Sequence, residues 1–248
     1  MKVIGILWLR QLKRYFRSKA RMLGSLGQPI LFLVALGFGF GPIFEKAGGG
    51  NYLQFLAPGI IAMSILFTAT FMGIEVIWDR QFGFLKETLV APVPRWKIML
   101  GRTLGGATVA VMQGIIVLLI SLLFGLQISN WLMVPLALLF MFLIAILFTA
   151  VGTAIACLID DMHGFQLIIN FLIMPLFFLS GALFPLTGLP SFVMVIARLN
   201  PLSYGVDGLR ETLVNLSYFN IFGNIIVLGV ISFIFVIIGA YLFSKIEA

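Results

Sequence analysis

The residue types that most often perform catalysis are scarce and scattered in this sequence. The single histidine, His163, follows Asp160 and Asp161 in a short polar stretch, and the single cysteine is Cys157. Two aspartates and a histidine this close could bind a metal weakly, although such a triplet is more often a solvated turn. Ser180 lies on the order of 20 Å from His163 along a helix that rises 1.5 Å per residue, too far for a hydrolase pair. We therefore predict no catalytic site, no metal site and no internal disulfide.

The sequence also lacks a nucleotide-binding motif. There is no GxxxxGKS/T phosphate-binding loop, and Gly37, Gly39 and Gly41 follow no strand, so they favour close helix packing or a bend. ATP, if it is used, belongs to a partner chain. A proton-coupled carrier normally places acids in the middle of its spans. Here every Asp and Glu lies at or near the end of an apolar segment, which disfavours a secondary transporter.

A dense polar segment, residues 75–102, interrupts the apolar sequence and holds eight of its 25 charges. Within it Phe82, Leu85 and Leu89 share one helical face, and two prolines follow them. The pattern predicts a short amphipathic helix over residues 79–91 at the membrane surface. Such a helix either anchors a loop there or contacts a second protein.

Two charges of this segment fall at the edges of predicted spans. Glu75 lies near the end of the second span and Arg102 at the start of the third. An uncompensated charge costs about 2.5–3.5 kcal/mol if it sits deep in the membrane. Each is therefore expected to reach the surface or to find an opposite charge.

The elements that must carry these residues are membrane helices. The sequence is 61% hydrophobic and 10% charged, against roughly 25% charged in a typical soluble domain. About 20 apolar residues suffice for a helix to cross the hydrocarbon core, and the segments lack the alternation of barrel strands. We predict an all-α integral membrane protein that forms a single transmembrane domain over residues 1–248. Its six transmembrane helices are expected near residues 25–44, 55–77, 103–126, 132–158, 164–184 and 221–243.

The distribution of Lys and Arg sets the expected orientation, because their excess marks the cytoplasmic side. With both termini inside, the cytoplasmic segments hold 13 of the 16 basic residues. We therefore predict a multi-pass protein of the inner or plasma membrane with both termini cytoplasmic. The net charge of +7 then reflects attraction to anionic membrane lipids rather than to nucleic acid.

Residues 2–22 are expected to form an amphipathic helix that lies in the inner interface. Its basic side chains recur at spacings of three and four, while Ile4, Trp8 and Tyr15 line much of the opposite face. The basic residues are Arg10, Lys13, Arg14, Arg17 and Arg21. The pattern is that of a membrane-surface anchor, and a helix that also touches a cytoplasmic partner is a compatible alternative.

Residues 185–216 are expected to form an outer helical hairpin before the last span. Prolines divide this segment into short pieces, none of them long enough to cross a membrane. We predict a re-entrant or surface hairpin on the outer side. Asp207, Arg210 and Glu211, spaced three and four apart, are expected to pair along one helix.

With these motifs the sequence resembles the membrane subunits of type-2 ABC exporters, and the resemblance covers essentially the whole chain. Its specific parts are the segment from Glu75 to Arg102 and the segments Leu183–Pro190 and Asn200–Arg210. All three segments occupy the places that they have in this family of six-span exporters.

The resemblance implies a permease subunit. Two copies, or one copy and a close paralogue, would form the pathway, and two separate ABC ATPase subunits would bind ATP and Mg²⁺, so no cofactor is expected in this chain. Residues 79–91 would be the coupling helix, seated in a groove of the ATPase, with 2–22 as the interfacial connecting helix and 185–216 as an outer lid. The residues assigned to ATPase coupling are Asp79, Arg80, Phe82, Gly83, Leu85, Lys86 and Glu87. Those assigned to the outer lid are Pro185, Pro190, Asn200, Pro201, Tyr204, Asp207 and Arg210.

Two readings of the cargo follow from the same resemblance. The segment Phe82–Pro92 looks most like the drug and antibiotic efflux subgroup, and the absence of inward-facing charge suits an amphipathic drug-like or lipid-like cargo. The 25 Phe and five Tyr residues could instead include rings that stack on sugars, as in polysaccharide or lipid-linked glycan exporters of the family. An ATPase-independent carrier or a membrane-embedded enzyme is the alternative of another class, and dependence on a partner ATPase separates it from an exporter.

Overall fold

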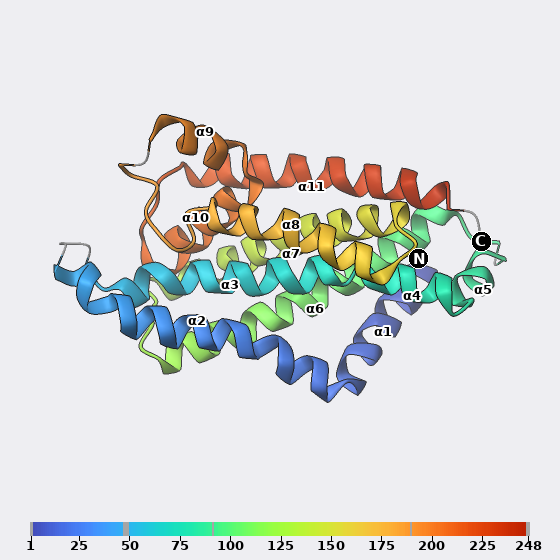
Figure 1. Cartoon of the computed structure of the whole chain (residues 1–248), viewed down its shortest axis with the longest axis horizontal. Coiled ribbons are helices and arrows are strands. Elements are labelled where there is room, and N and C mark those ends of the chain that lie inside the picture. Colours follow the sequence, from blue (N-terminus) through green and yellow to red (C-terminus); the bar gives the residue numbers. More distant parts are fainter. Residues whose placement is uncertain (1, 47–49, 91, 189, 247–248) are drawn as a thin grey trace.

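The structure, a computed structural model, describes residues 2–46, 50–90, 92–188 and 190–246, with all side chains in these ranges except those of Arg21, Lys86 and Leu89. These ranges form helices joined by turns, and they contain no strand (Figure 1). The predicted all-α membrane fold is therefore confirmed. The helices are α1 (Lys2–Arg17), α2 (Lys19–Lys46), α3 (Tyr52–Phe71), α4 (Ile74–Gln81), α5 (Phe84–Val90), α6 (Arg95–Leu123), the short 3₁₀ helix η1 (Trp131–Met133), α7 (Val134–Leu158), α8 (Met162–Phe178), α9 (Ser191–Leu199), α10 (Pro201–Val214) and α11 (Ile221–Ser244).

Five segments of the described chain are long and apolar enough to cross a membrane. They are Met22–Lys46, Tyr52–Gln81, Arg95–Leu123, Trp131–Leu158 and Ile221–Ser244. They correspond to the first, second, third, fourth and sixth predicted spans. The second segment combines α3 and α4, which are separated only by the turn at Met72 and Gly73.

The fifth predicted span, 164–184, is shorter than expected. Its helix α8 has 17 residues, the lower limit for a crossing. It ends because the chain turns at Ser180 and Gly181, where the glycine has φ = 75°, a left-handed conformation that residues with a Cβ rarely adopt. Ser180, predicted to lie in the span, is part of this turn.

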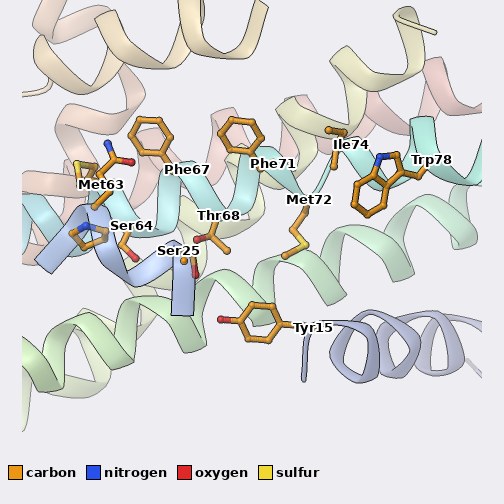
Figure 2. Close-up of a pocket in the computed structure, with 13 residues that line it drawn as sticks. Tyr15, Ser25, Met63, Ser64, Phe67, Thr68, Phe71, Met72, Ile74 and Trp78 are labelled. Carbon is orange, nitrogen blue, oxygen red and sulfur yellow. The ribbon is translucent and has the colours of Figure 1, made fainter. Parts of the chain in front are cut away.

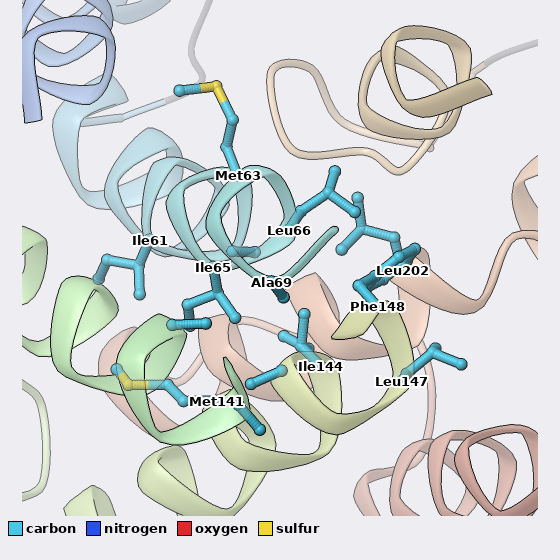
Figure 3. Close-up of a cluster of buried hydrophobic side chains, with 14 of the residues drawn as sticks. Ile61, Met63, Ile65, Leu66, Ala69, Met141, Ile144, Leu147, Phe148 and Leu202 are labelled. Carbon is cyan, nitrogen blue, oxygen red and sulfur yellow. The ribbon is translucent and has the colours of Figure 1, made fainter. Parts of the chain in front are cut away.

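Helix α3 forms the centre of the bundle. It contacts α2, α6, α7, α8 and α10, and a helix that is apolar on every side is expected to be enclosed. Figure 3 shows Ile65, Leu66 and Ala69 of α3 facing Ile144 and Phe148 of α7. All five side chains are buried, so the interior is built around this pair of helices.

The two ends of the bundle differ in what they carry. Helix α5, the start of α1 and the end of α11 lie toward one end, here called the α5 end (Figure 1). Helix α9, the end of α2 and the start of α3 lie toward the other, here called the α9 end. Helix α1 is set at an angle to α2, from which it is separated by Ser18.

Candidate functional site

A buried cluster of charges joins three helices near the α5 end. Asp79 of α4 accepts a hydrogen bond from Arg102 Nη2 of α6 at 2.5 Å and one from Arg10 Nη2 of α1 at 3.1 Å. Arg14 Nη1 lies 3.6 Å from a carboxylate oxygen of Glu75 and 3.6 Å from one of Asp79. Glu75, Asp79 and Arg102 are each less than 5% exposed. Buried charges are tolerated when they are paired in this way, and the two span-edge charges, Glu75 and Arg102, both have an opposite charge.

Helix α1 is held against the bundle by contacts with α6 as well. Leu7, Gln11 and Tyr15 form its buried face, and Gln11 packs on the bare backbone of Gly105, where an added Cβ would lie 2.7 Å from its side chain. The Tyr15 hydroxyl donates to Gln113 Oε1 at 2.7 Å. The helix ends at Arg17, so the predicted 2–22 helix is too long and Arg21 belongs to α2.

The predicted coupling helix, 79–91, is divided in two by the structure. Its first three residues complete α4, the chain turns at Phe82 and Gly83, and only Phe84–Val90 form α5. Gly83 has φ = 78°, which breaks the helix. Ala91 and the Lys86 side chain lie outside what the structure describes.

This division changes which residues of the segment face outward. Phe82 and Phe84 are 70% and 52% exposed, and Glu87 is also exposed. Leu85, expected to face a partner, is 1% exposed and belongs to the hydrophobic core. Asp79, also assigned to ATPase coupling, is buried in the charge cluster, so neither of these two side chains lies on an outward surface.

Arg80 holds the end of α4 to the turn between α7 and α8. Its guanidinium pairs with the carboxylate of Asp160 and donates to the carbonyl oxygen of Cys157 at 3.3 Å. Gln81 Nε2 donates to the Asp160 carbonyl oxygen at 3.0 Å. Arg80 therefore joins the connection that follows α4 to the connection between α7 and α8. It does not project from the rim of an outward surface.

The surroundings of His163 are those of a helix start. Asp161 accepts the backbone N–H of Gly164 at 2.6 Å and caps α8, and this bond lowers the pKa of the Asp161 carboxyl. Within the described residues no three His, Cys, Asp or Glu side chains gather closely enough to hold a metal ion.

A groove beside α5 is lined with basic and aromatic side chains. It has a volume of about 590 Å³ and lies between α1 and the segment from Trp78 to Phe84. The basic residues that line it are Arg10, Lys13, Arg14 and Arg17. Asp79 is the one carboxylate among the described residues that line it, so the groove is electropositive.

An apolar pocket lies next to this groove, between the end of α1, the start of α2 and helices α3 and α4. It has a volume of about 460 Å³, and its walls include Met63, Phe67, Phe71 and Met72 (Figure 2). None of the described residues that line it is charged. Trp78 lines both the pocket and the groove.

The segment predicted to form an outer hairpin contains α9 and α10, and α10 is embedded rather than superficial. It contacts α3, α7 and α11. Gly208 lets it approach α7 so closely that an added Cβ would lie 2.2 Å from the Phe140 ring. Asn200 caps α10 by accepting the Leu202 N–H, with Pro201 at the first helical position. Tyr204, near the start of α10, donates to a carbonyl oxygen of α9, whereas Pro185 and Pro190 lie in the turn before α9.

The expected ion pairing along α10 is replaced by bonds to backbone. Asp207 accepts the N–H groups of Tyr218 and Phe219 at 2.7 and 2.9 Å. Arg210 donates to the carbonyl oxygen of Gly181 at 2.9 Å and stacks on the ring of Phe55. Among the ion pairs of the described residues none involves Asp207, Arg210 or Glu211, because the first two side chains point to different neighbouring segments.

Sequence reasoning missed the pocket and the part that Trp78 plays in both cavities. The pocket residues come from four helices and form no local pattern. The position of Trp78 was one available signal for its role. It lies one residue before Asp79 at a predicted membrane edge, and Trp and Tyr side chains are enriched at membrane edges.

Comparison with known proteins gives a consistent result. The family described as "ABC-2 type transporter" matches residues 2–214. The chain is 31% identical to a putative transport permease, ycf38, of Cyanophora paradoxa, over 93% of this chain and 83% of the relative. It is 30% identical to the inner membrane transport permease YadH of Escherichia coli K12, over 82% and 80%, and 29% identical to nodulation protein J of Rhizobium leguminosarum bv. viciae, over 84% and 83%.

Proposed function

The chain belongs to the ABC-2 type transporter family, and on this premise we propose that it is the permease subunit of an ATP-driven exporter that moves an amphipathic cargo out of the cytoplasm. Members of this family normally form dimers and work with ATPase subunits. The proposal therefore includes a second copy of this chain or a close paralogue. It assigns ATP and Mg²⁺ to two separate ATPase chains.

The observation that carries the proposal is the exposed aromatic pair at the turn between α4 and α5. Phe82 and Phe84 stand out beside an electropositive groove, and aromatic side chains flanked by charge are typical of interface hot spots. The same turn is bonded through α4 to α1, to α6 and to the α7–α8 connection. A movement of the ATPase at this turn would be passed to several spans as a rigid-body displacement.

Docking of the ATPase is tested by co-purification. The full chain is expressed with its host's ABC ATPases, isolated in mild detergent, and examined for a bound ATPase and for ATP hydrolysis. Phe82→Asp with Phe84→Asp should abolish the association, because two charges would replace the exposed rings. Trp131→Asp with Leu132→Asp, two exposed apolar residues between α6 and α7, is the matched control and should retain it. Equal recovery of the ATPase by both variants would overturn this assignment.

The orientation proposed for the exporter has α1 and α5 in the cytoplasm. It rests on residues 1–21 and 80–102, which hold 12 of the 16 Lys and Arg residues. In a Cys157→Ala background, Glu87→Cys should resist a membrane-impermeant maleimide in whole cells, while Thr187→Cys, in the exposed turn before α9, should react. The reverse pattern would refute the orientation.

The cargo that we propose is drug-like or lipid-like. The described residues that line the pocket beside α3 and a second pocket of about 460 Å³ near the start of α3 are mostly apolar or aromatic, and none of them is charged. An amphipathic molecule partitions into such surroundings, whereas a free ion does not. ATP-dependent uptake by inside-out vesicles of an amphipathic dye would support this cargo class.

A glycan is the second candidate cargo. The pocket near the start of α3 gathers Phe40, Phe44, Tyr52, Phe178 and Phe184, and aromatic rings of this kind can stack on sugars. Uptake of a lipid-linked oligosaccharide by the same vesicles, with no uptake of the dye, would favour the glycan.

A further inference from the structure

The electropositive groove beside α5 carries more positive charge than the carboxylates of the buried charge cluster neutralise. Arg10 and Arg14 face Asp79 and Glu75. Lys13 and Arg17 are exposed, line the groove and take part in none of the ion pairs of the described residues. At least two cations of the groove are therefore available to a negatively charged ligand.

The groove and the apolar pocket meet at Trp78. The Arg14 guanidinium lies 5.1 Å from the centre of the Trp78 ring, and the indole Nε1 contacts Met162 Sδ at 2.8 Å. The ring is therefore held between α1 and α8. The site changes from charged to apolar across this one side chain.

The pocket runs along the helix axis away from the groove. Its lining residues on α3 and α4 extend from Met63 to Trp78, which is roughly 22 Å at 1.5 Å per residue. One leaflet of the hydrocarbon core is about 15 Å thick. The Ser64 hydroxyl at its far end is buried and makes no hydrogen bond within the described structure. The pocket is long enough for an acyl chain that starts at the membrane surface.

We propose that the groove and the pocket together bind one anionic phospholipid of the inner leaflet. The phosphate head group would lie between Lys13 and Arg17, and an acyl chain would pass Trp78 and enter the pocket between α2 and α3. A phospholipid fits because it joins an anion to a long apolar chain, as the site joins cations to an apolar cavity. The leaflet rests on the orientation proposed above, but the binding itself does not.

The bound lipid would fill the angle between α1 and α2. Figure 2 shows Tyr15 of α1 facing Thr68 and Met72 across the pocket. A lipid there would contact α1, α2, α3 and α4 at once. It would therefore bind α4, which leads to the turn between α4 and α5, and α1, which is bonded to α4.

Quenching of Trp78 by brominated lipid tests the proposal. The full-length protein is placed in nanodiscs that contain an equal, small fraction of either bromo-acyl phosphatidylglycerol or bromo-acyl phosphatidylcholine. The difference between the wild type and Trp78→Phe isolates the signal of this one ring. We expect several-fold stronger quenching of Trp78 by the phosphatidylglycerol.

Two pairs of variants separate the head group from the chain. Lys13→Gln with Arg17→Gln should remove the preference for phosphatidylglycerol, while Lys2→Gln with Lys19→Gln, which lose the same charge outside both cavities, should keep it. Gly24→Leu places a side chain at the pocket wall and should weaken quenching. Gly27→Leu, on the same helix but outside the pocket, should not, and an added Cβ meets no neighbour within 4 Å at either glycine.

Three results would overturn the proposal. The first is equal quenching by the two lipids, and the second is an equal loss of preference in both charge variants. The third is displacement by soluble glycerol phosphate with no effect of Gly24→Leu, which would indicate a site for a free phosphate anion. Because the readout needs neither ATPase nor transport, failure of the exporter proposal would leave this result unchanged.

Discussion

Arg102 of α6 and Asp79 of α4 form an ion pair of 2.5 Å in the interior of the bundle, where each residue is less than 5% exposed. Arg102 also lies against the ring of Phe243, 5.9 Å from its centre. The pair therefore connects α4, which leads to the turn before α5, with the two spans α6 and α11. Its charge balance determines the stability of this end of the molecule.

Removing one partner of this pair should be costly. Asp79→Asn leaves the Arg102 guanidinium buried without its counter-charge, and such a change typically costs 3–5 kcal/mol. The free energy of unfolding, measured by graded addition of denaturing detergent to mixed micelles, should fall by about that amount. Arg10→Gln breaks a pair whose cation is 39% exposed and should cost no more than about 1 kcal/mol. Similar losses in the two variants would contradict the burial argument.

The crossing of α7 with the α3–α4 junction should tolerate no side chain at Gly152. A Cβ there would lie 2.2 Å from the Thr70 carbonyl oxygen, and one at Gly73 would lie 2.2 Å from the Gly152 carbonyl oxygen. Backbone cannot move aside as a flexible side chain can, so we expect Gly152→Ala to cost at least about 1–3 kcal/mol. In the same unfolding assay Gly229→Ala, which meets no neighbour within 4 Å, should be neutral or slightly stabilising.

Leu85 and Phe82 should respond differently to truncation. Leu85→Ala empties part of the core and is expected to lower the free energy of unfolding by about 2–5 kcal/mol. Phe82→Ala removes an exposed ring and should leave stability almost unchanged while it weakens ATPase binding. Thermal unfolding in detergent together with ATPase co-purification resolves the two effects. A fully stable Leu85→Ala protein would show that this residue is not in the core.

The cap of α8 should make a pH-dependent contribution. The pKa of Asp161 is lowered in the folded protein by the Gly164 N–H, so its ionised form favours folding. This contribution is complete above the pKa of the unfolded carboxyl, near 4, and is lost as the pH falls through the folded value. Asp161→Ala should therefore melt at a lower temperature than the wild type at neutral pH, and the difference should shrink on acidification. A difference that does not depend on pH would contradict the role of the charge.

Composition and apolar length were sufficient to predict the helical membrane fold. The fourth and sixth predicted spans, 132–158 and 221–243, agree with α7 and α11 to within a few residues, because polar turns flank long uninterrupted apolar runs. The end of α8 was not predictable in this way. It depends on the left-handed backbone at Gly181, which Leu186 packs against, and no periodicity encodes that contact.

The polar segment 75–102 shows why a helical face predicted from sequence is not enough to place the residues of a site. An unbroken helix over 79–91 would put Phe82 and Leu85 on one face, but the turn at Gly83 places Phe82 outside and Leu85 inside. Arg80 likewise finds its partner at Asp160, 80 residues away, and Asp79 finds its partner at Arg102, at the far end of the same segment. These partners are set by the packing of α6, α7 and α8, which a local pattern does not contain.

The bonds that hold α1 also impose an order on biosynthesis. Trp8, Arg10 and Tyr15 bond to partners that follow them by 100, 69 and 98 residues. Helix α1 is synthesised before these partners, and it therefore cannot reach its final place until the polypeptide has been extended through α6. Until then α1 lacks these three partners, so we expect it to lie on the bilayer surface and to pack against the bundle only after α6 has been made. A nascent chain arrested before Gln113 should accordingly leave α1 open to protease, and one arrested after α6 has been inserted should protect it.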